Sequence, residues 1–177
     1  ISPILDVINN NNIHFIKENG LFSFANVVFN HMAVDVAPKD YIKAKDFDAH
    51  YKIALHHGAV HNAKTDIGFQ ISNDHVTTEL FDGHDLTLLG DIHKPAQFLN
   101  KEKTIGYPGS LIQQNHGEAL DHGILVWDLP DRTSEFIEIQ NDYGYVTFEV
   151  ENAKIKKSPH RVPAKPRVRI KFTDTDA

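Results

Sequence analysis

The stretches YKIALHHGAVH (residues 51–61) and HDLTLLGDIHKP (residues 84–95) decide how this chain folds. Each contains a short run of apolar and β-branched residues, which predicts a buried strand. Each run ends close to a glycine, and histidine or aspartate residues lie beside that glycine in the sequence. In α/β folds, strand ends of this kind are where functional side chains are placed. We therefore expect the functional residues of this chain at the ends of these two strands.

The first of these strands is followed by adjacent histidines, His56 and His57, and then by Gly58. Gly58 lets the backbone turn sharply or come close to a ligand. A pair of exposed loop histidines without a function fits this stretch equally well. The stretch alone leaves both interpretations open.

The second strand ends at Gly90, which is followed by Asp91, Ile92 and His93. In an extended segment, side chains two residues apart point to the same side, so Asp91 and His93 are expected to converge on one centre. Imidazole and carboxylate together suit Mn²⁺, Fe²⁺ or Zn²⁺ and disfavour Cu⁺. A lone D-x-H motif also fits an aspartate that caps a turn beside an exposed histidine.

A third polar stretch, YPGS at residues 107–110, contains a strong turn signal. Ser110 together with backbone amides is able to hold a phosphate group. The other interpretation is a tight connection beneath the site. We favour the connection for Gly109 and leave Ser110 open.

Strands are also expected elsewhere in the chain, and one short amphipathic helix is expected at residues 3–10. The further expected strands lie at 13–16, 21–24, 26–34, 104–107, 123–129, 135–139 and 145–150. Near-continuous apolar strands indicate sheets that are covered on both faces, as in layered α/β folds.

The composition is that of a globular protein, with 177 residues, 41% hydrophobic and 24% charged. No apolar run approaches the roughly 20 residues that a membrane helix needs. Cysteine is absent, so any metal must sit on nitrogen and oxygen ligands. There is no glycine-rich phosphate loop, no serine-hydrolase elbow and no dinucleotide fingerprint, which argues against nucleotide binding and serine hydrolysis.

Charge is unevenly distributed along the chain. Residues 1–153 carry 10 Lys and Arg against 22 Asp and Glu, whereas residues 154–177 carry 8 against 2. The acidic part suits divalent cations and the basic tail suits a polyanion such as DNA, although a solvated linker also explains the tail. We predict one domain over residues 1–150, a basic proline-rich linker over 151–166, and the start of a DNA-facing second domain over 167–177.

Taken in order, the motifs LHHG, LLGDIHK, YPGSL and HGILVWDL resemble the calcineurin-like metallophosphoesterases. Within that superfamily they are most similar to the SbcD-type nuclease subunits of DNA repair and recombination, in particular to phage or viral members. The likeness covers about residues 1–150. It implies an α/β fold, a four-layer α-β-β-α sandwich present here only as its C-terminal half. It also implies two divalent metals, Mn²⁺ first and Mg²⁺ as the alternative.

The resemblance assigns three metal ligands. His56 matches the ligand of the family's His-x-Gly loop, and His93 matches the second histidine of its Gly-His-x-His motif. Asp91 stands where the family has the first of those histidines. His57 is the fallback ligand and the candidate catalytic group. Ser110 and Lys94 are candidate substrate contacts.

The resemblance also implies a function for the parent protein. It implies a metal-dependent DNA exonuclease or endonuclease, acting as a homodimer with an ABC-type ATPase subunit that has a coiled coil, in the cytoplasm of a host cell. The family's Asp-x-His, Gly-Asp and Gly-Asn-His-Asp motifs do not occur here, so we expect the fragment alone to be inactive. The alternatives are a phosphoesterase for nucleotides or phosphoproteins and a non-catalytic scaffold.

Overall fold

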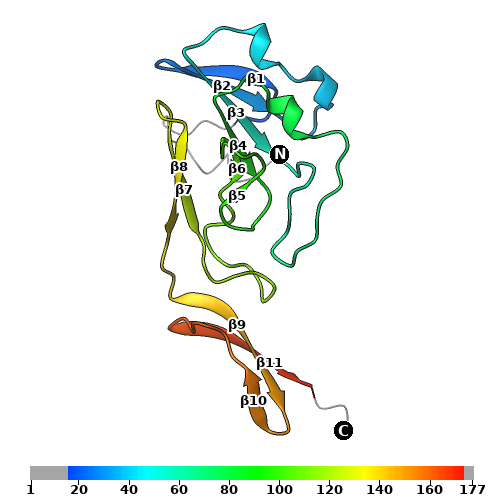
Figure 1. The fold of residues 1–177 in the computed structure, drawn as a ribbon, viewed down its shortest axis with the longest axis vertical. Helices are drawn as coiled ribbons and strands as arrows, with labels where there is room; N and C mark the ends of the chain where they lie inside the picture. The colour runs from blue at the N-terminus through cyan, green and yellow to red at the C-terminus, as the bar shows by residue number, and fades with distance from the viewer. Residues whose placement is uncertain (1–15, 174–177) are drawn as a thin grey trace, which may run out of the picture.

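The computed structural model describes residues 16–173, which form three β-sheets with short 3-10 helices (Figure 1). The strands are β1 (Gly20–Phe24), β2 (Val27–Met32), β3 (Tyr51–His57), β4 (Leu86–Gly90), β5 (Gln97–Phe98), β6 (Ile105–Tyr107), β7 (Gly123–Asp128), β8 (Thr133–Glu138), β9 (Tyr143–Glu151), β10 (Lys154–Lys157) and β11 (Lys165–Phe172). The 3-10 helices are η1 (Pro38–Asp40), η2 (Ala44–Asp46) and η3 (Thr78–Phe81).

The largest sheet has the strand order β1-β2-β3-β4-β6-β5. Strands β2, β3, β4 and β6 are parallel, and the edge strands β1 and β5 pair antiparallel to their neighbours. The register places Met32 beside His56 and places His57 beside Gly90. The carboxyl ends of the parallel strands therefore meet at one edge of the sheet, where the motifs of the sequence come together.

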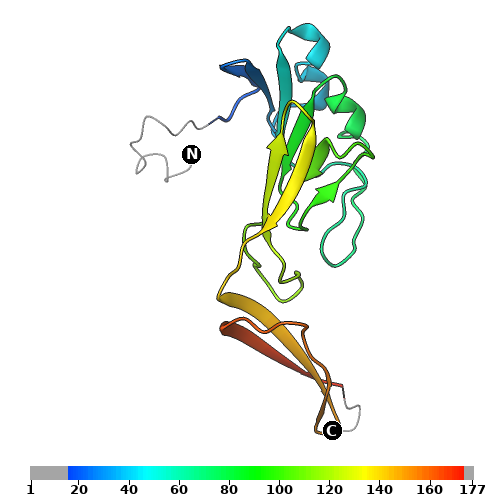
Figure 2. The same cartoon turned by 60° about the vertical axis from the view of Figure 1, so that its left-hand side comes forward.

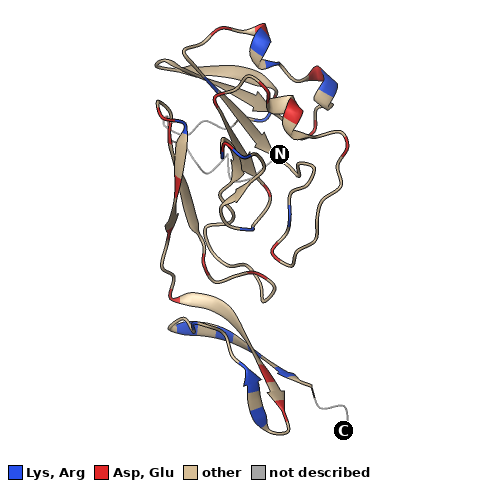
Figure 3. Cartoon of the chain, viewed as in Figure 1, with Lys and Arg blue, Asp and Glu red and all other residues tan. Residues whose placement is uncertain are grey.

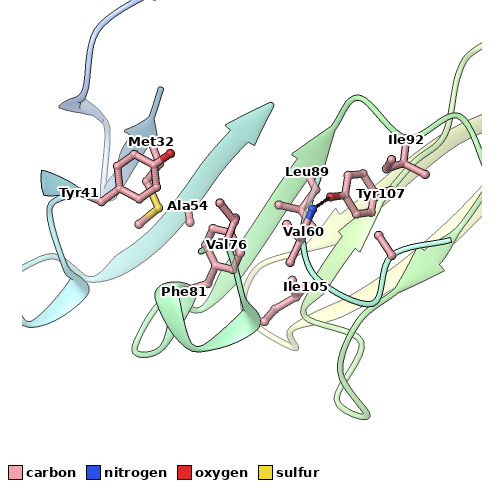
Figure 4. Packing of buried hydrophobic residues seen from close by; sticks show 11 residues of the cluster. Met32, Tyr41, Ala54, Val60, Val76, Phe81, Leu89, Ile92, Ile105 and Tyr107 are labelled. Carbon is pink, nitrogen blue, oxygen red and sulfur yellow. Dashed lines mark hydrogen bonds between the residues drawn. The ribbon is translucent and has the colours of Figure 1, made fainter. Parts of the chain in front are cut away.

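One face of this sheet carries the main hydrophobic core (Figure 4). Buried side chains of the strands, among them Leu89 and Ile105, meet Val60, Val76 and Phe81 from the segments that connect the strands. Parallel strands require long crossover connections. In this chain these connections are largely irregular and contain the 3-10 helices and the short strand β5 but no α-helix, yet their apolar side chains bury that face of the sheet.

The opposite face carries a smaller core of Val27, Ile53 and Leu86. The hairpin of β7 and β8 supplies Trp127 against this core, and the Trp127 ring lies 5.9 Å from the ring of Phe98 in an edge contact. The two views agree that the hairpin lies alongside the large sheet (Figures 1 and 2). The β7–β8 hairpin thus covers this face of the large sheet.

The third sheet, with the order β10-β9-β11, extends away from the rest of the molecule (Figures 1 and 2). Strand β11 pairs parallel to β9 over eight residue pairs, and β10 pairs antiparallel to the other side of β9. The predicted domain boundary at residue 150 falls within β9, and the stretch predicted as a linker contributes β10 to this sheet. The beginning of a second domain at residue 167 stays a prediction.

The expected four-layer α-β-β-α sandwich is wrong for the described part of the chain. Residues 16–173 form three separate β-sheets and contain 3-10 helices but no α-helix. Apolar strands indicate that the faces of a sheet are buried, but they do not indicate which elements bury them. The expectation failed for this reason, because here loops and a hairpin cover the sheet. The predicted strands within residues 21–150 are confirmed.

Some predictions fall beyond the described residues. The predicted helix at residues 3–10, and all but the last residue of the predicted strand at 13–16, lie outside them. Among residues 16–173, no helix is long and apolar enough to cross a membrane.

Candidate metal centre

His56 lies near the end of β3 and is 4% exposed. Its ring packs edge-on to Tyr41 and tilted against Phe81, with ring centroids 6.0 Å and 6.1 Å away. Atom Nδ1 of His56 lies 2.8 Å from the carbonyl oxygen of Met32 on the neighbouring strand. Because a carbonyl oxygen only accepts hydrogen bonds, Nδ1 carries the proton and donates it. The other ring nitrogen, Nε2, keeps its lone pair for a metal.

Gly58 places no side chain of its own beside this nitrogen, although Cγ2 of Val34 lies 3.3 Å from the position that a β-carbon of residue 58 would take. A β-carbon built on Gly58 would lie 2.7 Å from Nε2 of His56, which is closer than van der Waals contact allows. Tyr107, which is fully buried, fixes the glycine loop. Its hydroxyl donates to the carbonyl oxygen of Gly58 at 2.7 Å and accepts from the Val60 amide at 3.0 Å (Figure 4 shows the second bond).

Burial lowers the pKa of His56, and the negative charge of Asp91 opposes this shift. The neutral imidazole is the form that binds metals, so burial favours a ligating state near neutral pH. The same burial effect raises the pKa of the Tyr107 phenol to about 12, so that its hydroxyl stays protonated.

Asp91 follows β4 directly and is exposed. Its φ angle is +94°, in a region that residues with a β-carbon rarely adopt and that costs about 1–3 kcal/mol. The extended geometry that we assumed for residues 91–93 is therefore absent at Asp91. Seven other described residues with a β-carbon also have positive φ angles, so the angle alone does not mark a functional site.

His57 lies apart from His56. Successive strand residues point to opposite faces, and His57 is exposed with its ring over Gly90, where a β-carbon would lie 2.6 Å from Nδ1 of His57. Both histidines line a cavity of about 320 Å³ that Trp127 also borders. His57 is therefore open to a ligand in this cavity, but it lacks a hydrogen bond like the one from His56 to Met32 in the described part of the chain.

His93 is half-exposed and its Nδ1 atom lies 3.0 Å from Oε1 of Glu118. The side chain of Glu118 is 7% exposed. The structure thus joins His93 to an acidic residue that lies 25 positions further along the chain. No spacing or motif around Glu118 in the sequence signals this contact.

Asp66 and His122 also lie near Glu118, with one ligand atom from each of the three residues within 4.8 Å of the others. His122 is a poor metal ligand, because Nδ1 lies 2.8 Å from the carbonyl oxygen of Ser110 and Nε2 lies 2.9 Å from that of Ala119. Both ring nitrogens are thus bound to the main chain. Asp66 has one buried carboxylate oxygen without a partner in the described residues.

Burial raises the pKa of Asp66, and the charge of Glu118 raises it further, whereas His122 and Lys94 oppose the shift. Asp66, His93 and Glu118 line a cavity of about 270 Å³. Two acidic residues, Asp66 and Glu118, therefore line the same cavity as the predicted ligand His93.

The YPGS turn acts as a connection beneath the site. Gly109 has a φ angle of +88°, and a β-carbon there would lie 2.8 Å from the carbonyl oxygen of His93. The amide of Ser110 donates to the same oxygen at 3.2 Å, and its hydroxyl donates to the carbonyl oxygen of Ile112 at 2.9 Å. Ser110 therefore holds the His93 loop in place, and its hydroxyl is directed into the protein's own main chain.

His56 lies near the end of β3, and Asp91 follows the neighbouring strand β4. His93 contacts Glu118 instead. Among the described residues, His56, Asp91 and His93 do not form a group with ligand atoms within 4.8 Å of one another, whereas Asp66, Glu118 and His122 do. Sequence reasoning missed Glu118, Asp66 and Tyr107. Of these, only Tyr107 had a local signal, because it opens the YPGS turn.

No family model matches the chain. The chain is 40% identical over 186 aligned residues to a protein of Acanthamoeba polyphaga mimivirus that is named uncharacterized protein R555. The alignment covers 99% of this chain and 14% of the viral protein. The chain therefore spans a small part of the length of this relative, and the viral protein's name states no activity.

Proposed function

We propose that this chain contributes His56, Asp91 and His93 to a divalent-metal centre of a nuclease that hydrolyses phosphodiester bonds in DNA. The observation that carries the proposal is the arrangement of His56. Its ring is buried, its Nδ1 is bound to the Met32 carbonyl oxygen, and its Nε2 lies over Gly58. The strained Asp91 follows the neighbouring strand. The ordered resemblance of the motifs to metallophosphoesterases supports the same assignment.

The donor set fits Mn²⁺, with Mg²⁺ as the alternative, because it combines imidazole nitrogen with carboxylate oxygen. A bound divalent metal polarises a phosphoryl oxygen and supplies hydroxide at neutral pH. Three ligands are fewer than a two-metal centre requires. The proposal therefore places the other ligands elsewhere in a longer protein, and we expect this chain alone to bind Mn²⁺ weakly and to be inactive.

The charge of β11 supports DNA as the substrate. Its alternate residues are basic and exposed, so their side chains leave the same face of the strand. Figure 3 shows Lys and Arg along β11. The four residues are Lys165, Arg167, Arg169 and Lys171. Lys165 lies 4.9 Å from the ring centroid of Tyr143, and Arg167 lies 5.2 Å from that of Tyr145. Basic side chains bind the phosphate backbone of a nucleic acid, and aromatic side chains stack on its bases.

The resemblance extends the proposal to partners. An ABC-type ATPase subunit with a coiled coil and a second copy of the nuclease are the proposed partners, and the cytoplasm of a host cell is the proposed location. The likeness to a mimivirus protein supports a viral setting.

The test measures Mn²⁺-dependent cleavage by the full-length protein that contains this chain. Linear duplex DNA and a small aryl phosphodiester are the two substrates, and His93→Ala is compared with the exposed-residue control His75→Ala. We expect cleavage of DNA that is lost in His93→Ala and kept in His75→Ala. Cleavage of the small ester alone would favour a phosphoesterase for other substrates, and no cleavage of either substrate would favour a scaffold.

A further inference from the structure

Glu118 is the buried acidic residue that contacts a proposed metal ligand. Its carboxylate accepts three hydrogen bonds in the described structure. Nδ1 of His93 lies 3.0 Å from Oε1, Nδ2 of Asn115 lies 2.6 Å from Oε1, and the amide of Gln114 lies 2.7 Å from Oε2. The Asn115 and Gln114 groups can only donate, so each oxygen of Glu118 acts as an acceptor, and these bonds fix the orientation of the carboxylate.

The loop that carries Glu118 is itself attached to the third sheet. The side chain of Gln113 donates to the carbonyl oxygens of Glu118 and Tyr145, at 2.8 Å and 3.1 Å. In return, the amide of Tyr145 donates to Oε1 of Gln113 at 2.6 Å. Strand β9 thus helps to fix the carboxylate. Glu118 is therefore held both through its carboxylate and through its main-chain carbonyl oxygen, independently of its contact with His93.

Oε1 of Glu118 already accepts a hydrogen bond from Asn115, and as an acceptor it requires a donor at Nδ1 of His93, so Nδ1 carries the proton in this contact. Its Nε2 then keeps the lone pair. His56 has the same arrangement, because its Nδ1 donates to the Met32 carbonyl oxygen. Metal-binding histidines commonly donate their second ring N–H to a carboxylate or carbonyl oxygen, which fixes the tautomer and raises ligand basicity.

We propose that Glu118 is a positioning residue, which holds His93 in the Nδ1-protonated tautomer so that Nε2 is presented to the metal. The role in metal binding rests on the proposed function of His93, whereas the tautomer does not. His93 is 42% exposed, so packing alone does not fix its ring as it does for His56. The contact with Glu118 supplies that constraint.

The first measurement is the tautomer of His93 in the metal-free, full-length protein, read from long-range ¹H–¹⁵N correlations of its ring. We expect protonation at Nδ1. Protonation at Nε2 in the unsubstituted protein would overturn the proposal without any substitution being made. This readout stays valid if the protein binds no metal, so it separates failure of this proposal from failure of the proposed function.

The second measurement uses Glu118→Ala, with Glu102→Ala as a control at an exposed turn. The alanine leaves no side-chain acceptor facing Nδ1 of His93. We expect His93 to lose its preference for the Nδ1-protonated tautomer and Mn²⁺ affinity to fall about 10–100-fold. Neither should change in Glu102→Ala. An unchanged tautomer and unchanged Mn²⁺ affinity in a folded Glu118→Ala protein would reject the positioning role.

Discussion

Nδ1 of His56 lies 2.8 Å from the carbonyl oxygen of Met32, which belongs to the neighbouring parallel strand. The register of β2 and β3 sets this contact, so the tautomer of His56 is a consequence of how the sheet is paired. The fold thereby prepares Nε2 as a ligand. Each of the following predictions changes one part of this arrangement in the full-length protein that contains the chain.

Gly58→Ala should reduce Mn²⁺ affinity and also lower the free energy of unfolding, because it overpacks the core beside His56. The new β-carbon would lie 2.7 Å from Nε2 of His56, and the ring cannot easily move away, because Tyr41, Phe81 and the Met32 carbonyl oxygen hold it. Calorimetric titration with Mn²⁺ measures the effect. Gly20→Ala in β1 is the matched control and should leave the titration unchanged; equal affinity in both variants would show that the space at Gly58 is not used by a metal.

Asp91→Gly should separate stability from metal binding. Glycine adopts a φ angle of +94° without the steric cost that aspartate has there. We expect the free energy of unfolding to stay equal or to rise by up to about 1 kcal/mol, because glycine's greater freedom in the unfolded chain offsets part of the relief. Mn²⁺ affinity should fall.

Lys103→Gly is the control for the previous variant, because Lys103 also has a positive φ angle but lies in an exposed turn. It should relieve strain and keep Mn²⁺ affinity. If Asp91→Gly also kept full affinity, the carboxylate of Asp91 would be excluded as a ligand.

Tyr107→Phe should destabilise the protein by about 1–3 kcal/mol, as expected when buried polar groups lose their partner. The hydroxyl of Tyr107 joins the Gly58 carbonyl oxygen to the Val60 amide in the core. Urea denaturation gives the free energy of unfolding. Tyr143→Phe removes a hydroxyl from a residue that is 62% exposed and should have little effect. Similar losses in both variants would contradict a special role for the buried hydroxyl.

The stability of the protein should fall as the pH drops below about 6.5. Burial lowers the pKa of His84 in the folded state. Its Nδ1 donates to the Phe81 carbonyl oxygen, and its Nε2 accepts from the side-chain amide of Asn30. Below its ordinary pKa, the unfolded chain therefore binds a proton that the folded protein resists. The stabilisation is present above that pH and is lost towards the folded-state pKa.

His84→Gln should reduce this pH dependence, because glutamine does not titrate. The measurement is the free energy of unfolding at a series of pH values between 5 and 8, compared with His75→Gln at an exposed position. A pH dependence that is the same in all three proteins would show that His84 does not contribute to it.

The strands of this fold could be predicted from the sequence, since runs such as residues 51–55 and 123–129 are rich in β-branched and aromatic residues. Strand β10 was missed, because KIKK is exposed and charged and becomes a strand only by pairing with β9. The layered α/β architecture was predicted wrongly. Apolar strands indicate burial, but the nature of the covering elements depends on contacts that are distant in sequence.

The site could be predicted in part for a similar reason. His56 lies near the end of β3 and Asp91 follows β4, and strand ends are visible in the sequence as apolar runs that stop close to a glycine. The contact between His93 and Glu118 depends on how two loops fold together, which no local pattern encodes. The positive φ angle of Asp91 could not be predicted either, because aspartate rarely adopts it and the sequence has no glycine at that position.

Mn²⁺ titration of the full-length protein, unsubstituted and as His56→Gln, tests the central claim most directly. We predict that the unsubstituted protein binds Mn²⁺ and that His56→Gln weakens binding by more than the roughly 10–100-fold typical of losing an outer hydrogen-bond partner. The circular dichroism spectrum of the variant should remain unchanged. An identical binding isotherm for a correctly folded His56→Gln protein would contradict the assignment of a metal centre to the ends of these parallel strands.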